Sequence, residues 1–286
     1  MDSDQRWEKI KRESISMKKL FLMIFNIFLS TQCAFATNWC NDANMKGAWK
    51  MDEASGSVAD CTSNGNNGTN TSGTQGVTGK FSNGISYPQV NNQKLSIPAS
   101  TSLNNVTVLS TGLWANNTSF GATDGIASDR GCLIGKGYRS GALYFKLTNQ
   151  VRWVEHWPGG TAQWDTTGGN AVTGTWQHYA VTYDRSSTAN NPTIYIDGTS
   201  QANSQTGTAP CCGGRDDDSV NALILAQDGN DLAELNSTID EGFWYSGILT
   251  STQINDIKDN GLAGAAAINV DIIRGGSLLQ GGSKIL

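Results

Sequence analysis

The chain has 286 residues, of which 16% are charged and 38% hydrophobic, and its formal net charge is −5. A chain this acidic lacks the basic surface that displaces counterions from nucleic acid, so we expect no nucleic-acid partner. The low charge and the 33 glycines argue against a long-helix or coiled-coil protein, and the nine tryptophans argue against a largely disordered chain.

A leader opens the chain. Lys18 and Lys19 precede the apolar run 20–29, and a small-x-small triplet follows at 34–36. This order is typical of a secretory signal peptide. We therefore predict an upstream segment and a cleaved signal peptide over residues 1–36, with an uncleaved anchor as the alternative. No later stretch is apolar enough to cross a bilayer, so we expect a secreted or cell-surface protein, of bacterial type, with no membrane span after cleavage.

Short runs of β-branched and aromatic residues alternate with Gly, Asn and Ser turns, which predicts an all-β, two-sheet antiparallel sandwich. Run 175–184 is apolar on both faces, so we place it centrally. Thr250 or Ser251 caps one short helix near the C-terminus, and Gly261 ends it. Four tryptophans inside strand patterns are expected in the core: Trp49, Trp114, Trp176 and Trp244. The predicted strands are 45–51, 93–97, 105–114, 131–136, 142–148, 150–155, 175–184, 193–197, 221–227 and 236–245.

Export would place the five cysteines that follow the leader in an oxidising compartment, where disulfides persist. Cys40 and Cys61 flank the first predicted strand, and a bridge closing a loop of this length contributes about 3 kcal/mol. We therefore expect these two cysteines to pair. Cys132 is expected to pair with Cys211 or Cys212, which leaves one thiol over.

Several motifs occur in an order found in a known family. Their combined pattern resembles the laminin-G-like jelly-roll domains of the concanavalin A-like lectin/glucanase superfamily. The resemblance covers about residues 44–262 and implies a jelly-roll domain over 37–262. The matching segments are Gly47 to Glu53, Asp60 to Thr69, Gly79 to Gly84, Trp176 to Asp184, Ile194 to Gly198 and Ile239 to Tyr245.

The resemblance also implies one structural calcium ion. Its ligands would be Asp240 at the closing strand and oxygens of the N-terminal turn, where Asp60 is the nearest match. Two further runs, 215–218 and 228–231, offer carboxylate oxygens, but neither has the spacing of a 12-residue calcium loop. The alternative is that all these acids are solvated loop residues.

Aromatic residues give the strongest ligand signal. Trp153, Trp157 and Trp164 lie within twelve residues, with Glu155 and His156 beside them. Alternation assigns Trp153 to the core, whereas Trp157 and Trp164 fall on predicted turns and are expected to be exposed. Indole faces stack on sugar rings while polar neighbours bind hydroxyl groups, so these residues are candidate glycan ligands. Contact with a protein and plain packing remain open.

The sequence gives no sign of a catalytic centre. Retaining glucanases of the superfamily carry a Glu-x-Asp-x-x-Glu run, which is absent here; Glu155 stands alone, and Asp240 and Glu241 face opposite sides of their strand. We predict no catalytic residue and a secreted, non-catalytic binding or adhesion module for an extracellular polysaccharide or glycoprotein. A self-associating structural subunit and a glycan-cleaving enzyme are the alternatives.

The C-terminal tail, residues 263–286, has a different composition. Ile268, Val270 and Ile272 alternate with polar residues, and Gly-Gly-Ser breaks follow. This pattern predicts an extra strand that covers a sheet edge or pairs with a second copy of the chain. A partly ordered tail is the alternative.

Overall fold

The computed structural model describes residues 36–90, 92–120, 130–137, 140–168, 171–211, 215–229 and 233–264. All of the predicted leader except Ala36 lies outside these residues, as does all of the predicted tail after Gly264. Self-association through the tail therefore stays a prediction. No helix of the described part is long and apolar enough to cross a membrane.

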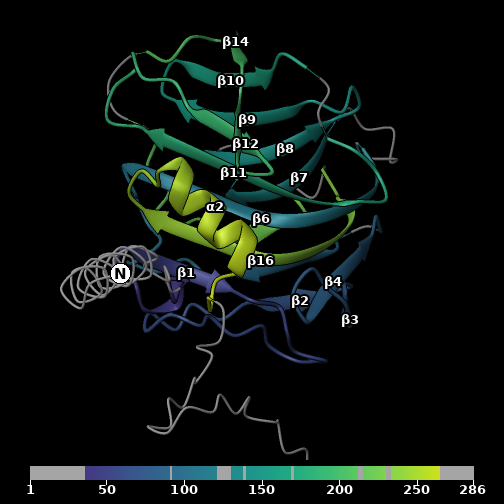
Figure 1. Cartoon of the computed structure of the whole chain (residues 1–286). Helices are drawn as coiled ribbons and strands as arrows, with labels where there is room; N and C mark the ends of the chain where they lie inside the picture. Colours follow the sequence, from purple (N-terminus) through teal and green to yellow (C-terminus); the bar gives the residue numbers. More distant parts are fainter. Residues whose placement is uncertain are drawn as a thin grey trace, which may run out of the picture. The chain divides into compact units, whose positions relative to one another are not determined.

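The described chain forms two antiparallel sheets of eight strands each (Figure 1). In the first sheet the order is β13-β12-β11-β6-β16-β4-β3, and β1 pairs with β16. Its strands are β1 (Met45–Trp49), β3 (Thr74–Thr78), β4 (Asn83–Pro88), β6 (Val108–Ser119), β11 (Trp176–Asp184), β12 (Thr193–Ile196), β13 (Thr199–Gln201) and β16 (Asn236–Ser246).

The second sheet has the order β14-β10-β9-β8-β7-β15-β5-β2. Its strands are β2 (Thr69–Thr71), β5 (Lys94–Ile97), β7 (Arg130–Lys136), β8 (Ser140–Lys146), β9 (Val151–Trp157), β10 (Gly160–Thr166), β14 (Asn203–Gly207) and β15 (Leu223–Leu225).

One hydrophobic core joins the two sheets. Strand β11 directs Tyr179, Val181 and Tyr183 into it, and the facing sheet contributes Phe145 and Trp153. Both faces of β11 are buried, because the strand lies between β6 and β12 and its other face is covered by a helix. The predicted all-β jelly-roll sandwich and the central place of this strand are confirmed.

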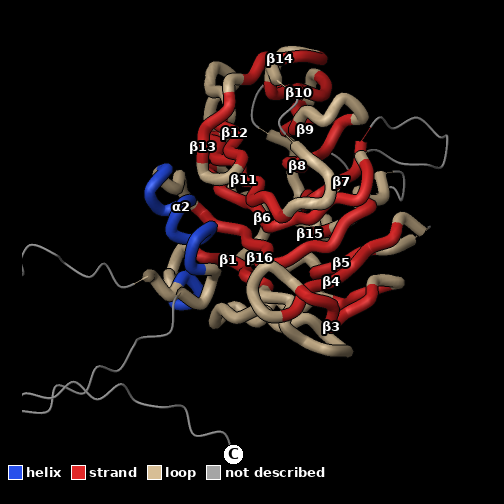
Figure 2. The backbone as a smooth tube through the Cα atoms, turned by 45° about the vertical axis from the view of Figure 1, so that its right-hand side comes forward, coloured by secondary structure: helices blue, strands red, loops and turns tan. Residues whose placement is uncertain are grey.

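The one α-helix of the described residues, α2 (Ser251–Asn260), lies on the outer face of the first sheet (Figure 1). Thr250 caps it, accepting a hydrogen bond from the backbone N–H of Gln253, and Gly261 ends it with a φ of 71°. Ile254 and Ile257 pack in a second apolar cluster on β11 and β16. The predicted helix is therefore present, and in Figure 2 it lies to one side of the strands.

The two ends of the described body meet. A 3-10 helix, η1 (Trp39–Asn41), follows the first residues, and the backbone N–H groups of Trp39 and Cys40 donate to the carbonyl of Leu262 at 2.9 and 3.3 Å. A Cβ atom added to Gly264 would lie 2.8 Å from the carbonyl oxygen of Thr37. The first and last described segments are thus in direct contact.

The disulfide between Cys40 and Cys61 is present. The pairing predicted for Cys132 is wrong, because Cys132 is a buried thiol on β7. Its side chain packs with Ala142 and Tyr144 in a small cluster separate from the main core. Cys211 is disulfide-bonded, but not to Cys132.

Six strands escaped the sequence analysis: β2, β3, β4, β10, β13 and β14. Strands β2, β13 and β14 contain only polar residues and glycine, so they offer no hydrophobic alternation. Backbone hydrogen bonds to a neighbouring strand define them instead. Strand β10 carries Trp164, which the sequence had placed on a turn.

Candidate functional site

The tryptophans expected on turns lie in the core. Trp157 and Trp164 are each 1% exposed, and Trp153 is fully buried. Strands β9 and β10 form a hairpin in which Trp153 pairs directly with Trp164, so both indoles face inward. Trp157 is the last residue of β9 and shares the inward face by alternation. The expected exposed aromatic surface is therefore wrong, and plain packing is correct for these indoles.

Contacts within the sandwich hold Trp164 in place. Its ring meets that of Tyr183 edge-on, with centroids 5.4 Å apart, and its Nε1 donates to Asn191 Oδ1 at 2.8 Å. Of the four tryptophans predicted in the core from strand patterns, Trp49, Trp114 and Trp244 are buried, whereas Trp176 is only half-buried.

Glu155 and His156 are separated by the alternation of β9. Glu155 points inward and is fully buried, whereas the His156 side chain is 40% exposed and its Nδ1 contacts Asp216 Oδ2. Arg185, the residue after β11, places Nη1 3.4 Å from Glu155 Oε1. Burial raises the pKa of Glu155, and the guanidiniums of Arg185 and Arg215 oppose this rise.

Glu155 belongs to a buried cluster of charges that bridges the two sheets. Arg215 Nη2 donates to Asp218 Oδ2 at 2.8 Å, and Lys136 Nζ lies 3.4 Å from Asp218 Oδ1. The side chains of Lys136, Arg185 and Asp218 are fully buried, and that of Arg215 is 7% exposed. Burial lowers the pKa of Lys136, which Asp218 opposes.

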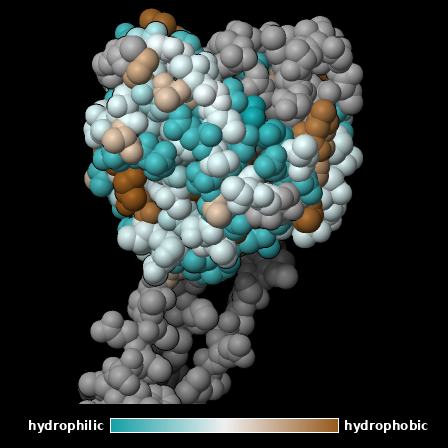
Figure 3. Space-filling view, turned by 90° about the horizontal axis from the view of Figure 1, so that it is seen from above, coloured by the Kyte–Doolittle hydropathy of each residue, from teal (hydrophilic) through white to brown (hydrophobic). Residues whose placement is uncertain are grey.

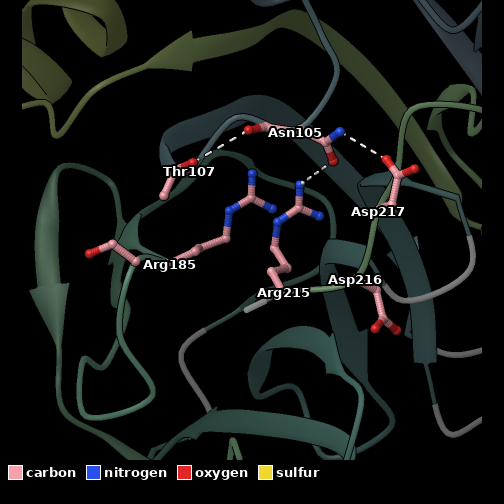
Figure 4. Close-up of a pocket in the computed structure, with 7 residues that line it drawn as sticks. Asn105, Thr107, Arg185, Arg215, Asp216 and Asp217 are labelled. Carbon is pink, nitrogen blue, oxygen red and sulfur yellow. Dashed lines mark hydrogen bonds between the residues drawn. The ribbon is translucent and has the colours of Figure 1, made fainter. Parts of the chain in front are cut away.

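The charge cluster forms one wall of an open pocket of about 430 Å³. Three loops build it: the approach to β6, the turn after β11, and the segment before β15. Figure 4 shows the Arg185 and Arg215 side chains extending toward Asn105. The lining residues are Asn105, Thr107, Arg185, Ser186, Arg215, Asp216 and Asp217.

Asn105 connects these loops. Its φ of 52° lies in the left-handed region, which Asn tolerates better than most residues. Arg215 Nη2 donates to its Oδ1 at 3.4 Å, and its Nδ2 donates to Asp217 Oδ1 at 2.8 Å (Figure 4). The backbone N–H of Arg185 donates to the carbonyl of Thr107 at 2.9 Å. Backbone and side-chain bonds thus hold the polar lining in place.

Asp60 and Asp240 do not fit a shared calcium site. Oδ1 of Asp60 accepts bonds from the backbone N–H groups of Ala48 and Thr62 at 3.0 and 2.9 Å. Oδ2 of Asp240 accepts from the N–H groups of Lys80 and Phe81, both at 2.8 Å. These donors occupy positions that a cation would need.

Burial also raises the pKa of Asp240 to about 8, although its backbone hydrogen bonds oppose this rise. Within the described ranges, no three His, Cys, Asp or Glu side chains form a group that could hold a metal ion. The calcium ion stays a prediction without support from these contacts.

The sequence analysis missed four residues of this pocket: Asn105, Thr107, Arg185 and Ser186. It considered the acids of 215–218 only as calcium ligands. One signal was available, because Glu155 lies at an inward position of a strand rich in apolar residues, and a buried carboxylate needs a cationic partner.

The match to a family of known proteins covers more than half of the chain. The model of the concanavalin A-like lectin/glucanases superfamily matches residues 89–255. The chain belongs to this superfamily. The comparison with curated proteins returned no match.

Several solved structures are similar to this chain at low sequence identity. The binding domain of Paraclostridial Mosquitocidal Protein 1 has 16% identity and a TM-score of 0.57, covering 81% of this chain and 54% of its own. Trypanosoma rangeli sialidase has 13% identity and a TM-score of 0.55, with coverages of 77% and 33%. The ligand binding domain of Botulinum neurotoxin serotype D, in complex with N-acetylneuraminic acid, has 10% identity and a TM-score of 0.53, with coverages of 76% and 50%.

This chain therefore spans about half of the length of the two toxin domains and a third of the length of the sialidase. At such identities the likeness concerns the fold alone. The fold occurs in binding domains and in an enzyme, so function has to be argued from the site.

Proposed function

We propose that this protein is a secreted, non-catalytic module that binds extracellular carbohydrate in the pocket between Asn105, Arg185 and Arg215. The observation that carries the proposal is the fixed polar lining of that pocket. Sugar ligands are recognised by a few polar groups held in place, because each hydroxyl needs a donor or acceptor at a defined position. Asn105 and Asp217 offer such groups and are already oriented by hydrogen bonds.

The surface supports a polar ligand. Seen from above in Figure 3, most of the coloured surface ranges from hydrophilic (teal) to intermediate (white), and its hydrophobic atoms form separate patches. A docking surface for an apolar partner would expose a large continuous patch. The large exposed apolar side chains of the described residues are dispersed along the chain: Val90, Leu147, Val172, Val220 and Ile248.

The ligands of similar structures agree with this proposal. One of the toxin domains with the same fold binds N-acetylneuraminic acid, and the sialidase has been determined with sialic acid. These likenesses, at 10–13% identity, favour a carbohydrate over other ligand classes.

The carboxylates of the pocket favour binding over hydrolysis. Glycoside hydrolysis needs two carboxyl groups that reach the glycosidic bond from opposite sides. Glu155 and Asp218 are fully buried and paired with guanidiniums. Asp216 and Asp217 are accessible, but one contacts His156 and the other accepts from Asn105 and Ser219. We assign these groups to structure and recognition.

Secretion is supported by the disulfide between Cys40 and Cys61, because such bonds persist in oxidising compartments.

A glycan array probed with the purified full chain tests the function. The pocket variant Asn105→Ala should lose binding to the glycans that the wild type retains. Asn116→Ala is the matched control, because Asn116 lines a second polar hollow of about 420 Å³ elsewhere on the molecule. Loss of binding in Asn116→Ala with retention in Asn105→Ala would contradict the assignment of the pocket. A wild type that binds no glycan would contradict the function.

A further inference from the structure

Among the residues that the structure describes, the buried charges beside the pocket do not balance. Lys136, Arg185 and Arg215 supply three positive charges, whereas Glu155 and Asp218 supply two negative ones. The excess positive charge lies in a chain whose formal net charge is −5. A buried charge without a counter-ion is costly, so the cluster favours an additional anionic group nearby.

Both arginines also keep unused donors. Arg185 Nη1 faces Glu155, and Arg185 Nη2 donates to the carbonyl of Val106, but the buried Nε has no acceptor among the described residues. Arg215 directs Nη2 to Asp218 and Asn105, and its buried Nη1 likewise has no acceptor in this part of the chain. Guanidiniums with free donors bind carboxylates well, because the planar N–H fork matches two oxygens.

The two guanidiniums are close enough to affect each other. Burial lowers the pKa of Arg185, and the charge of Arg215 acts in the same direction. In Figure 4 both side chains extend toward Asn105. An anion placed between Asn105 and the guanidiniums would reduce their repulsion.

The rim of the pocket limits the kind of anion. Asp216 and Asp217 line the same pocket, and hydrogen bonds from Asn105 and Ser219 lower the pKa of Asp217. Ionised carboxylates repel a ligand that carries several anionic groups, but they accept hydrogen bonds from hydroxyl groups. A ligand with one carboxylate and several hydroxyls matches both parts of the pocket, whereas a polyanion matches only one.

We propose that this pocket selects sugars that carry a carboxylate, namely uronic or sialic acids, with the carboxylate at Arg185 and Arg215 and the hydroxyls at Asp217 and Asn105. The proposal rests on the carbohydrate-binding function and names its ligand class.

Calorimetric titration of the full chain with matched ligand pairs tests the selection. Galacturonic acid is compared with its methyl ester, and sialyllactose with its own methyl ester. These pairs keep the whole sugar and mask only the carboxylate. The acid of at least one pair should bind about ten-fold more tightly than its partner, which corresponds to roughly 1.4 kcal/mol. The preferred pair distinguishes a uronic acid from a sialic acid.

Two substitutions of Arg215 test whether this residue causes the preference for the acid. Arg215→Gln should bring the affinity of the acid to that of its neutral partner, and Arg215→Lys should restore only part of the difference, because Lys keeps the charge but lacks the fork. Thermal unfolding verifies that each variant is folded. If neither variant folds, the comparison of acid and neutral ligand on the wild type still decides the proposal. Added salt should then weaken binding of the acid more than binding of its neutral partner.

Each outcome bears on a different claim. Equal affinity for acid and neutral partner in both pairs would overturn the carboxylate selection and leave carbohydrate binding intact. Tighter binding of heparin or inorganic phosphate than of either acid would also overturn the selection. Failure of every sugar to bind would overturn the proposed function itself.

Discussion

Asn105 and Asp218, 113 residues apart, hold each other by reciprocal hydrogen bonds. The backbone N–H of Asn105 donates to Asp218 Oδ1 at 2.6 Å, and the backbone N–H of Asp218 donates to Asn105 Oδ1 at 3.1 Å. This pair joins the approach to β6 with the loop that carries Arg215. The pocket is therefore shaped by an interaction between two loops rather than by a strand.

Asp218→Ala should destabilise the protein by roughly 3–5 kcal/mol, because it leaves Lys136 and Arg215 buried without their shared carboxylate. Chemical denaturation measures this loss. Asp217→Ala is the control, since that side chain is exposed and its removal should leave the unfolding midpoint almost unchanged. If Asp218→Ala changed the free energy of unfolding as little as Asp217→Ala does, the pairing of the two loops would not contribute to stability.

Trp157→Ala and Trp164→Ala should each cost about 3–5 kcal/mol, because both indoles fill the core and their removal leaves cavities. Trp176→Ala should cost less, since Trp176 is half-buried. Thermal unfolding of the three variants gives the order of their stabilities. A Trp164 variant as stable as the wild type would contradict the burial of this residue.

His178→Phe should stabilise the protein. The imidazole is fully buried between Trp114 and Phe243, and neither ring nitrogen has a partner among the described residues. An apolar ring of similar shape removes that penalty, which is roughly 1–3 kcal/mol.

The burial of His178 also predicts that the stability of the protein depends on pH. Burial lowers the pKa of His178 from 6.5 to about 3. The unfolded chain therefore binds a proton below pH 6.5 that the folded chain does not, and the wild type loses stability as the pH falls toward 3. The advantage of the Phe variant should widen over that range. Parallel stability curves for the two proteins from pH 7 to pH 4 would refute this.

Cleavage after Ala36 should create a new ion pair. The backbone nitrogen of Thr37 lies 3.2 Å from Asp256 Oδ2, which also accepts a bond from Trp39 Nε1 at 2.9 Å. A free ammonium at Thr37 would strengthen this contact. Because it is exposed, we expect only about 0.2–1 kcal/mol.

Mass spectrometry of secreted protein identifies the first residue, and Asp256→Asn should slightly lower the unfolding temperature of the processed chain. A mature chain that begins elsewhere would exclude the contact.

The sandwich could be predicted from the sequence because its central strands carry clear apolar patterns. Strand β11 is apolar on both faces, and α2 has cap residues at both ends. Strands β13 and β14 could not be predicted, since they owe their conformation to pairing with neighbours.

The site was harder to predict, for a local reason. Trp157 precedes the short turn at Pro158 and Gly159, and Trp164 follows it. The glycine-rich sequence at this turn suggested an exposed loop. The turn is tight, so both indoles stay within strands. Arg185 and Arg215 come from loops 30 residues apart in sequence, and no local pattern indicates that they meet beside Glu155.

The contact between Thr37 and Gly264 determines how the domain would respond to tension. A force pulling on these two ends would act first on the bonds between η1 and Leu262, because the ends lie side by side there. The disulfide between Cys40 and Cys61 would then stop extension of the intervening residues and carry the load past β1. The two sheets, and the pocket between their loops, would remain unstretched until that point.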